Sequence, residues 1–348
     1  MAAASNRIAT SLARIASQPV HYNETVSTPK ANPNPGAPRS RILLCFACVY
    51  LFWGGTYLAM RFGVEVLPPF VLASTRFLIS GPLMLGFCLV RGISIRPSGR
   101  ELGLLAVIGI LMLSGGNTSV IWAEQYLPSG LTALLVASVP IFAALIEAML
   151  SHGEGLAMRG WVGIAVGFAG IVLLVSPDFK TANPAGNHQL IAAFVTLFGT
   201  LCWTSASVLS RHTTIRISGF AAAGWEMLFA GLFNAAIMLT QGGYKGSDWG
   251  PKAYLSILYL VIFGSLVTYT AYIYLLDNVA VSKVATYAYI NPMIAVVLGA
   301  IFLTERLTPI EYAGMAAILV AVFLVNSSKL TTGRTVAEAE LCDLEPQA

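Results

Sequence analysis

Residues 53–61 read WGGTYLAMR and residues 203–211 read WTSASVLSR, so a tryptophan and an arginine recur at the same spacing 150 residues later. Both segments lie within long apolar stretches. The chain has 348 residues, of which 56% are hydrophobic and 10% are charged. Soluble domains carry about 25% charged residues. The composition therefore excludes a soluble globular protein with a water-facing surface, and it predicts a protein embedded in a membrane.

Ten stretches are long and apolar enough to cross a bilayer, which takes about 20 residues in a helix. They are residues 42–60, 70–90, 102–122, 129–151, 158–176, 189–209, 219–240, 253–276, 282–303 and 308–326. Short connections between them hold most of the proline, glycine and charge. We therefore expect an all-α membrane protein with ten transmembrane helices. Residues 1–41 and 327–348 are polar and are predicted to be disordered tails.

The repeat extends along the whole chain, with an offset that drifts between 150 and 152 residues. The matching pairs are Trp53 and Trp203, Arg61 and Arg211, Gly81 and Gly231, Pro140 and Pro292, and Glu154 and Glu305. The two copies, 42–176 and 189–326, then hold five spans each. Because five is an odd number, the copies must cross the membrane in opposite directions. Inverted repeats of this kind place a binding site near the midplane in secondary transporters.

Lysine and arginine are shared unequally between the two ends of the predicted spans. With both termini in the cytoplasm, twelve of these residues near the spans face inward, and five face outward: Arg61, Lys180, Lys245, Lys252 and Arg306. The positive-inside rule favours this orientation. We expect a multi-pass protein of the cell membrane, in a bacterium the inner membrane, with both termini cytoplasmic.

Three segments carry a resemblance to a known family: WGGTYLAMRFG at 53–63, Pro140 within SVPIFAALIEAML, and NPMIAVVLGAIFLTERLTPIEYAGMAAILVAVFLV at 291–325. The chain resembles the EamA-type carriers of the drug/metabolite transporter superfamily, although Thr304 stands where their pattern usually has glycine before Glu305. The resemblance implies two inverted five-helix repeats around a central cavity. It also implies alternating access and the export of amino acids or other small amphipathic metabolites, with no cofactor and no required oligomer.

Two charged residues lie within predicted spans at matching places in the two copies. Arg76 is in the second span, and Glu226 is its repeat mate in the seventh. A charge inside a span normally faces protein or water. Inversion displaces the two residues in opposite directions, by roughly 13–15 Å at 1.5 Å per residue, so we do not expect them to pair directly. Arg76 suits a substrate carboxylate, or it is a structural arginine satisfied by carbonyl groups; Glu226 suits a substrate amine or a proton.

The ninth predicted span contains Lys283, Tyr287 and Asn291, spaced four residues apart. In a continuous helix this spacing places them on one face. The matching residues of the first copy, Leu131, Leu135 and Val139, are apolar, so one wall of the cavity is predicted to be polar and the opposite wall apolar. Lys283 is then a candidate partner for Glu226.

Aromatic and amide side chains complete the candidate substrate site. Trp53 and its mate Trp203 either line the cavity or pack between helices, and Asn117 is matched to Tyr269. Tyr272, Trp122 and Tyr274 lie nearer helix ends, and we expect them to belong to the interfacial aromatic belts that form there.

Energy coupling and rival functions are open at this point. Glu147, inside the fourth span without an obvious partner, joins Glu226 as a candidate for proton coupling to a membrane gradient. The alternative function is a membrane-embedded enzyme acting on a lipid or small metabolite. The four histidines are scattered over loops and tail, and no catalytic grouping is present in the sequence. Cys45 and Cys48 form a C-x-x-C within a span, but no second pair and no histidine accompany it, so they are expected to be packing residues. We therefore expect no enzyme, no metal site and no nucleic-acid partner.

Overall fold

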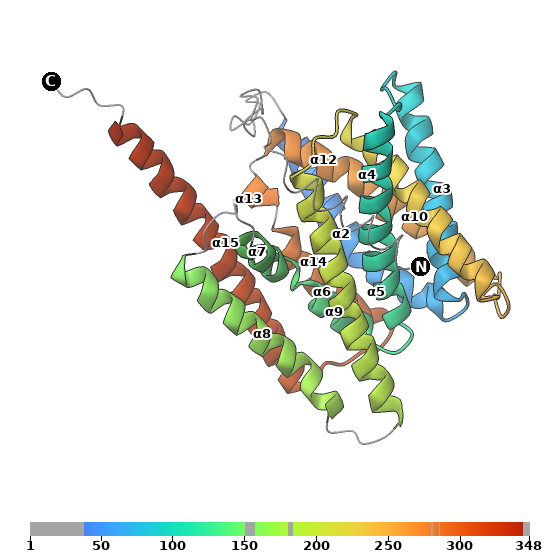
Figure 1. The fold of residues 1–348 in the computed structure, drawn as a ribbon. Helices are drawn as coiled ribbons and strands as arrows, with labels where there is room; N and C mark the ends of the chain where they lie inside the picture. The colour runs from blue at the N-terminus through green and yellow to red at the C-terminus, as the bar shows by residue number, and fades with distance from the viewer. Residues whose placement is uncertain (1–37, 150–156, 180–183, 280, 285, 344–348) are drawn as a thin grey trace, which may run out of the picture. The chain divides into compact units, whose positions relative to one another are not determined.

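The computed structural model describes residues 38–149, 157–179, 184–279, 281–284 and 286–343, and every regular element among them is helical (Figure 1). The predicted N-terminal tail up to residue 37 and the loop containing Glu154 lie outside the described residues. The first half comprises α2 (Arg39–Val64), α3 (Pro69–Val90), α4 (Gly99–Gly109), η1 (Ile110–Asn117), α5 (Thr118–Ala123), α6 (Ser129–Val136), α7 (Val139–Met149) and α8 (Met158–Phe179).

The second half follows the same order. It comprises α9 (Pro184–Arg211), α10 (Gly219–Thr240), α11 (Pro251–Val261), η2 (Ile262–Val267), α12 (Thr268–Asn278), α13 (Val281–Val284), α14 (Tyr287–Phe302) and α15 (Pro309–Asp343). The helix α10 begins and ends 150 residues after α3, and both have 22 residues. Arg76 and Glu226 therefore occupy the same position in equivalent helices, as the sequence repeat predicts.

The third and eighth spans share an unusual local structure. Each is interrupted by a π-helical segment, η1 in the first half and η2 in the second. The segments end in the same way, at a threonine whose backbone N–H and hydroxyl both donate to the carbonyl five residues earlier. Thr118 donates to the Leu113 carbonyl, and Thr268 donates to the Phe263 carbonyl. In this register Asn117 corresponds to Val267, so its predicted match to Tyr269 is wrong. The two π segments differ in length by two residues, so the offset changes from 152 in the helices directly before them, α4 and α11, to 150 in the helices directly after them, α5 and α12.

The two halves contact each other reciprocally. A Cβ atom added to Gly81 of α3 would lie 2.8 Å from the backbone nitrogen of Leu228, and one added to Gly231 of α10 would lie 2.8 Å from that of Leu78. Glycine lets the two backbones approach this closely. The two contacts are equivalent in the repeat, because Gly231 lies 150 residues after Gly81 and Leu78 lies 150 residues before Leu228. This exchange is the mark of a two-fold relationship between the halves.

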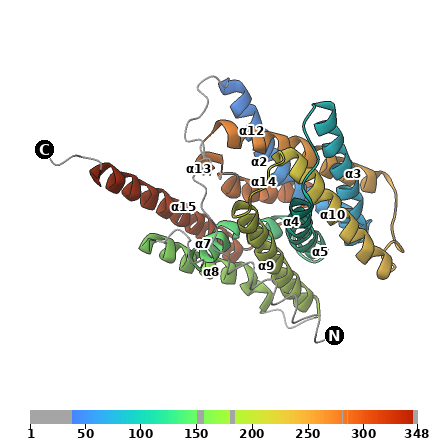
Figure 2. The same ribbon diagram turned by 45° about the horizontal axis from the view of Figure 1, so that its top comes forward.

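The helices α8 and α15 repeat this reciprocity. They run side by side in both views (Figures 1 and 2). Gly163 packs against Ala321 and Val325, while Gly314 packs against Gly170 and Leu174. With the offset of 151 expected for these spans, the two sets of contacts are equivalent.

Hydrogen bonds between loops show that the repeats are inverted. The backbone N–H of Asp248, in the loop before α11, donates to the carbonyl of Val66, in the loop after α2, at 2.8 Å. At the other end of the bundle, the N–H of Arg216, in the loop after α9, donates to the Glu101 carboxylate at the start of α4 at 2.6 Å. The loops after α2 and α9 are equivalent in the repeat, yet they lie at opposite ends. The predicted inversion is confirmed.

Nine helical stretches of the described residues are long and apolar enough to cross a membrane, and Tyr287–Phe302 is a shorter apolar helix. The predicted ninth span, 282–303, is therefore divided between α13 and α14. The fourth span bends at Ala137 and Ser138, between α6 and α7. Prolines follow both interruptions, Pro140 and Pro292, and a proline removes one backbone hydrogen bond from a helix.

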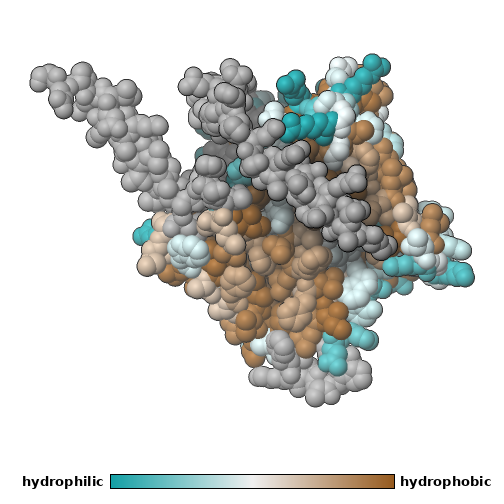
Figure 3. Space-filling model, in the orientation of Figure 1, coloured by the Kyte–Doolittle hydropathy of each residue, from teal (hydrophilic) through white to brown (hydrophobic). Residues whose placement is uncertain are grey.

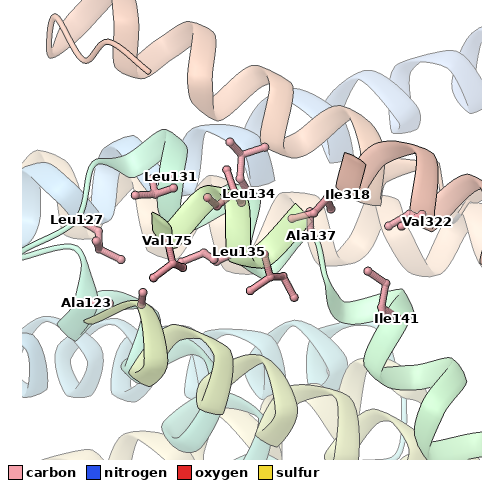
Figure 4. Close-up of a cluster of buried hydrophobic side chains, with 14 of the residues drawn as sticks. Ala123, Leu127, Leu131, Leu134, Leu135, Ala137, Ile141, Val175, Ile318 and Val322 are labelled. Carbon is pink, nitrogen blue, oxygen red and sulfur yellow. The ribbon is translucent and has the colours of Figure 1, made fainter. Parts of the chain in front are cut away.

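The largest apolar cluster joins α5–α8 of the first half to α9 and α15 of the second (Figure 4). Leu134, Leu135 and Ile141 are fully buried in it. Outside this core, large apolar side chains such as Phe194, Phe198 and Phe323 are more than half exposed. Figure 3 shows a broad apolar face with hydrophilic residues toward its upper and lower parts. Such a surface is stable against lipid.

The backbone of α15 is helical as far as Asp343, whereas the sequence predicted a disordered tail from residue 327. The run VAEAEL at 336–341 consists mostly of good helix formers, which explains how the helix can extend past its apolar part. The apolar part suited to a membrane is Pro309–Ser327.

Candidate functional site

Arg76 lies at the junction of α3, η1 and η2, with only 6% of its surface exposed. Its Nε donates to Ser265 Oγ at 3.1 Å, and one terminal nitrogen donates to Asn117 Oδ1 at 3.1 Å. The other terminal nitrogen makes a long contact, 3.5 Å, with the carbonyl of Gly264. A guanidinium has five N–H donors, so two are left for a ligand. Arg76 thus joins both π segments.

The segment η2 supplies two of the three acceptors around Arg76, Ser265 Oγ and the Gly264 carbonyl. The Gly264 carbonyl accepts a second bond, from the indole Nε1 of Trp53 at 3.2 Å. π segments are frequent at functional sites, because they change which backbone groups are available to side chains. A Cβ atom on Gly264 would lie 3.3 Å from the Arg76 guanidinium, so glycine also makes room for this side chain.

Aromatic rings from three elements meet beside this polar junction. The ring centroid of Trp53 in α2 lies 5.3 Å from that of Tyr272 in α12 and 5.4 Å from that of Tyr287 in α14. Tyr269 extends the group, with its ring 6.4 Å from that of Tyr272. The assignment of Tyr272 to an interfacial belt is therefore wrong. Its spacing of three residues from Tyr269, on the same helix face, was the signal that sequence reasoning missed.

Glu226 is buried in α10, with 8% of its surface exposed. The contacts of Gly81 and Gly231 place Glu226 about seven residues, or roughly 10 Å, from Arg76 along the packed helices. This separation is smaller than the sequence predicted. The ion pairs that the structure describes join Arg211 to Glu147 and Lys252 to Glu65, so Arg76 and Glu226 are not bonded to each other.

The predicted face of Lys283, Tyr287 and Asn291 is not formed. Lys283 lies exposed on the short helix α13, which ends at Val284, and a separate helix, α14, begins at Tyr287. Its predicted pairing with Glu226 is absent from the described ion pairs. The prediction assumed one continuous helix from 282 to 303.

Asn291, unlike Lys283, lies within the core. It is 8% exposed, and its Oδ1 has no hydrogen-bond partner among the described residues. Its backbone carbonyl would lie 3.1 Å from a Cβ atom on Gly54, so α14 and α2 are closely packed here.

Trp203 occupies the place equivalent to Trp53. A Cβ atom on Gly116 of η1 would lie 3.0 Å from the Cβ of Trp203. Each tryptophan therefore lies against the π segment of the opposite half, Trp53 on η2 and Trp203 on η1.

Glu147 has a partner, contrary to the sequence-based expectation. Arg211 at the end of α9 donates to its carboxylate at 2.7 Å, and the Glu147 side chain is largely buried. These residues are 64 positions apart and belong to different halves, so no local pattern pointed to the pair. The equivalent arginine, Arg61, donates instead to the backbone carbonyl of Glu124. The two repeat-related arginines thus tie helices together at opposite ends of the bundle.

A cavity of about 470 Å³ lies elsewhere, between α2, α3 and the η2–α12 segment. Its lining is almost wholly apolar and includes Cys45, Cys48, Leu83, Phe87 and Thr270, with Arg41 at one end. Arg76, Trp53 and Glu226 are not part of its walls. We therefore place the candidate site at the polar junction rather than in this cavity.

Comparison with known proteins decides the family. A family model described as the EamA-like transporter family matches residues 40–176 and 190–327 of this chain. The chain belongs to the EamA-like transporter family. It is accordingly a multi-pass membrane transporter rather than an enzyme, and the two matched regions are its duplicated halves.

Related EamA-like proteins cover most of the chain. It is 38% identical over 282 residues to the uncharacterized inner membrane transporter YedA of Escherichia coli K12, covering 81% of this chain and 89% of that protein. It is 24% identical to the uncharacterized transporter YvbV of Bacillus subtilis 168, covering 83% and 93%. A solved crystal structure, 22% identical, has a TM-score of 0.58 over 83% of this chain and 98% of that one. That likeness supports the fold alone.

Proposed function

We propose that this EamA-like protein exports small amphipathic metabolites, amino acids foremost, by alternating access across a bacterial inner membrane. Both termini lie in the cytoplasm in this proposal, which the distribution of lysine and arginine supports. The observation that carries the substrate class is the buried Arg76 guanidinium, which has unused donors and lies beside the rings of Trp53, Tyr272 and Tyr287.

Each part of such a substrate has a matching group in this proposal. Arg76 binds the carboxylate, and Asn117 orients the guanidinium. The apolar part of the substrate lies against the aromatic rings of Trp53, Tyr269 and Tyr287, and Trp203 covers it from the other half. Glu226 binds the amine, with Asn291 as a further polar contact and Lys283 as a contact near the cytoplasmic entrance.

Proton coupling is a separate part of the proposal, with Glu226 and Glu147 as candidates for carrying the proton. The bond between Arg211 and Glu147 favours Glu226 of the two, because Glu147 is already engaged in an ion pair that ties two helices together. No oligomer is needed for any of these roles.

Three probes that share a phenyl ring test the substrate class: L-phenylalanine, 3-phenylpropionate without the amine, and 2-phenylethylamine without the carboxylate. The measurement is counterflow exchange of each radiolabelled probe in liposomes that contain the purified protein. We expect exchange of phenylalanine. We expect Arg76→Ala to lower exchange of the two carboxylates at least about tenfold, the value of one strong charge-assisted contact.

Two variants sharpen this experiment. Glu226→Gln is expected to abolish the preference for phenylalanine over 3-phenylpropionate, since only phenylalanine has an amine. Ser80→Ala is the matched control for Arg76→Ala, because the bond that the structure describes for the Ser80 hydroxyl goes to the Arg76 backbone carbonyl and not to its guanidinium. Exchange of phenylalanine that survives Arg76→Ala unchanged would refute the assigned role of Arg76, and exchange of none of the probes would refute the substrate class.

A further inference from the structure

Glu124 follows the last residue of the third span and is completely buried. Neither of its carboxyl oxygens has a hydrogen-bond partner among the residues that the structure describes. Its neighbours in the chain, Ala123 and Leu127, belong to the apolar cluster shown in Figure 4. Among the buried carboxyl groups that the structure describes, Glu124 is the one with both oxygens buried and unbonded.

The charged and titratable groups that face Glu124 do not satisfy it. They are Tyr57 and Arg61 from α2 and Glu305 from the loop between α14 and α15. The Arg61 guanidinium donates to the backbone carbonyl of Glu124, not to its carboxyl group. The Glu305 carboxylate accepts bonds from Ser129 N–H and Oγ and from Gly130 N–H at 2.8–3.2 Å, so it is engaged with the start of α6 and offers Glu124 no hydrogen-bond donor.

A carboxyl group in this environment holds a proton. An ionised carboxylate buried without hydrogen bonds is far less stable than its neutral form, and it takes up a proton instead. Burial, with a smaller contribution from Glu305, raises the pKa of Glu124 well above its usual value, against the opposing effect of Arg61.

Glu124 lies at one end of the bundle, where four segments meet. The end of α2, the end of α5, the start of α6 and the loop before α15 meet there through the contacts of Arg61 and Glu305. Alternating access requires this end to open, which separates α2 from α5 and α6. Opening would expose Glu124 to water, and a hydrated glutamate, with an ordinary pKa of about 4.3, is ionised at neutral pH.

We propose that Glu124 is a proton-binding site of the transport cycle, protonated while this end of the protein is closed and ionised while it is open. Linkage then makes the coupling reciprocal: a bound proton favours closure, and closure favours proton binding. Each pH unit between the proton affinities of the two states changes the closed-to-open ratio by up to about tenfold. The site rests on transport by alternating access and not on the identity of the substrate.

The test measures opening directly, without substrate. In a chain whose own five cysteines have been replaced, Leu127→Cys places a thiol at a position that is 1% exposed beside Glu124. Its labelling by a maleimide in purified protein is measured from pH 5.5 to pH 8.5. Rates are divided by those of Tyr244→Cys, which is exposed in the closed state, because thiol reactivity itself depends on pH.

We expect normalised labelling of Leu127→Cys to rise several-fold per pH unit, and adding Glu124→Gln to keep it low at every pH. The control is Glu65→Gln. Glu65 is an exposed acid in the loop after α2 and is paired to Lys252, so its replacement should leave the rise of labelling with pH intact. Labelling that does not depend on pH, or an equal rise in the Glu124→Gln protein, would overturn the proposal. A purely structural role of Glu124 would lower thermal stability in Glu124→Gln without removing the rise. Failure of the phenyl-probe exchange leaves this result unaffected.

Discussion

At the scale of single residues, Arg76 combines a binding role with a bracing role. Its guanidinium holds Asn117 of η1 and Ser265 of η2 in place, and a lysine would keep the charge but not the planar set of donors. We predict that Arg76→Lys lowers phenylalanine exchange about tenfold or more. It should also lower the free energy of unfolding by about 1–3 kcal/mol, the cost of leaving buried polar groups unbonded.

Exchange assays and thermal unfolding of the same preparation separate the two roles. If Arg76 acts only as a brace, exchange per folded molecule stays at the wild-type value while stability falls. Wild-type exchange in Arg76→Lys would therefore contradict the binding role.

Glu124 gives a pH dependence of stability whose sign follows from burial. Its pKa is raised in the folded protein, so below the usual glutamate value, about 4.3, both folded and unfolded states are protonated. As the pH rises above this value, the unfolded state releases its proton before the folded state does, so the free energy of unfolding falls. We predict that wild type and Glu124→Gln have similar Tm values at pH 5, and that Glu124→Gln is the more stable protein at pH 8.

The quantity to measure is the difference in Tm between the two proteins, because other groups titrate equally in both. A difference that is constant from pH 5 to pH 8 would show that Glu124 is ionised throughout, against its assignment as a protonated group.

At the scale of elements, the contact between α3 and α10 depends on two glycines. A methyl group on Gly81 or Gly231 would lie 2.8 Å from a backbone nitrogen of the other helix, and backbone atoms cannot move aside without separating the helices. We predict that Gly81→Ala and Gly231→Ala each lower the free energy of unfolding by about 1–3 kcal/mol, as overpacking does. Equal effects are expected, because the contacts are equivalent.

Gly86 in the same helix is the matched control. A methyl group there meets nothing within 4 Å, so Gly86→Ala should be neutral or should stabilise by up to about 1 kcal/mol through helix propensity. Thermal unfolding in detergent compares the three variants. A loss in Gly86→Ala as large as in Gly81→Ala would show that close packing is not the cause.

Sequence reasoning identified the elements better than their interruptions. Helix boundaries 150 residues apart follow from the matched Trp53 and Trp203, because duplicated segments keep their spacing. The break before Tyr287 could not be seen, since Lys283, Tyr287 and Asn291 fit an unbroken helix equally well. The π segments are invisible to apolar periodicity.

The candidate site was predictable only in part, for a related reason. Arg76 and Trp53 stand out because a charge or an indole within a span is conspicuous. Glu124 does not, since it reads as a loop residue just past a span, and its burial comes from α2 and the distant loop at Glu305. The bond between Arg211 and Glu147 likewise depends on packing between halves.

At the scale of the whole molecule, every functional assignment depends on the inversion of two five-helix halves. The inversion puts the equivalent residues Arg76 and Glu226 at different depths, and it puts the equivalent arginines Arg61 and Arg211 at opposite ends. A transporter needs two ends that open in turn around one site. The duplication therefore supplies contacts between helices at each end of the bundle, made by Arg61 at one end and by Arg211 at the other.

Single cysteines test this arrangement most directly. Ser94 and Thr214 are exposed in loops on one side of the bundle, and Tyr244 is exposed in a loop on the other. Each is replaced by cysteine in the cysteine-free chain and treated in intact cells with a membrane-impermeant maleimide. We predict labelling of Tyr244→Cys in intact cells, and of Ser94→Cys and Thr214→Cys only after the cells are opened. Labelling of Ser94→Cys and Thr214→Cys from different sides of the membrane would contradict the inverted repeat.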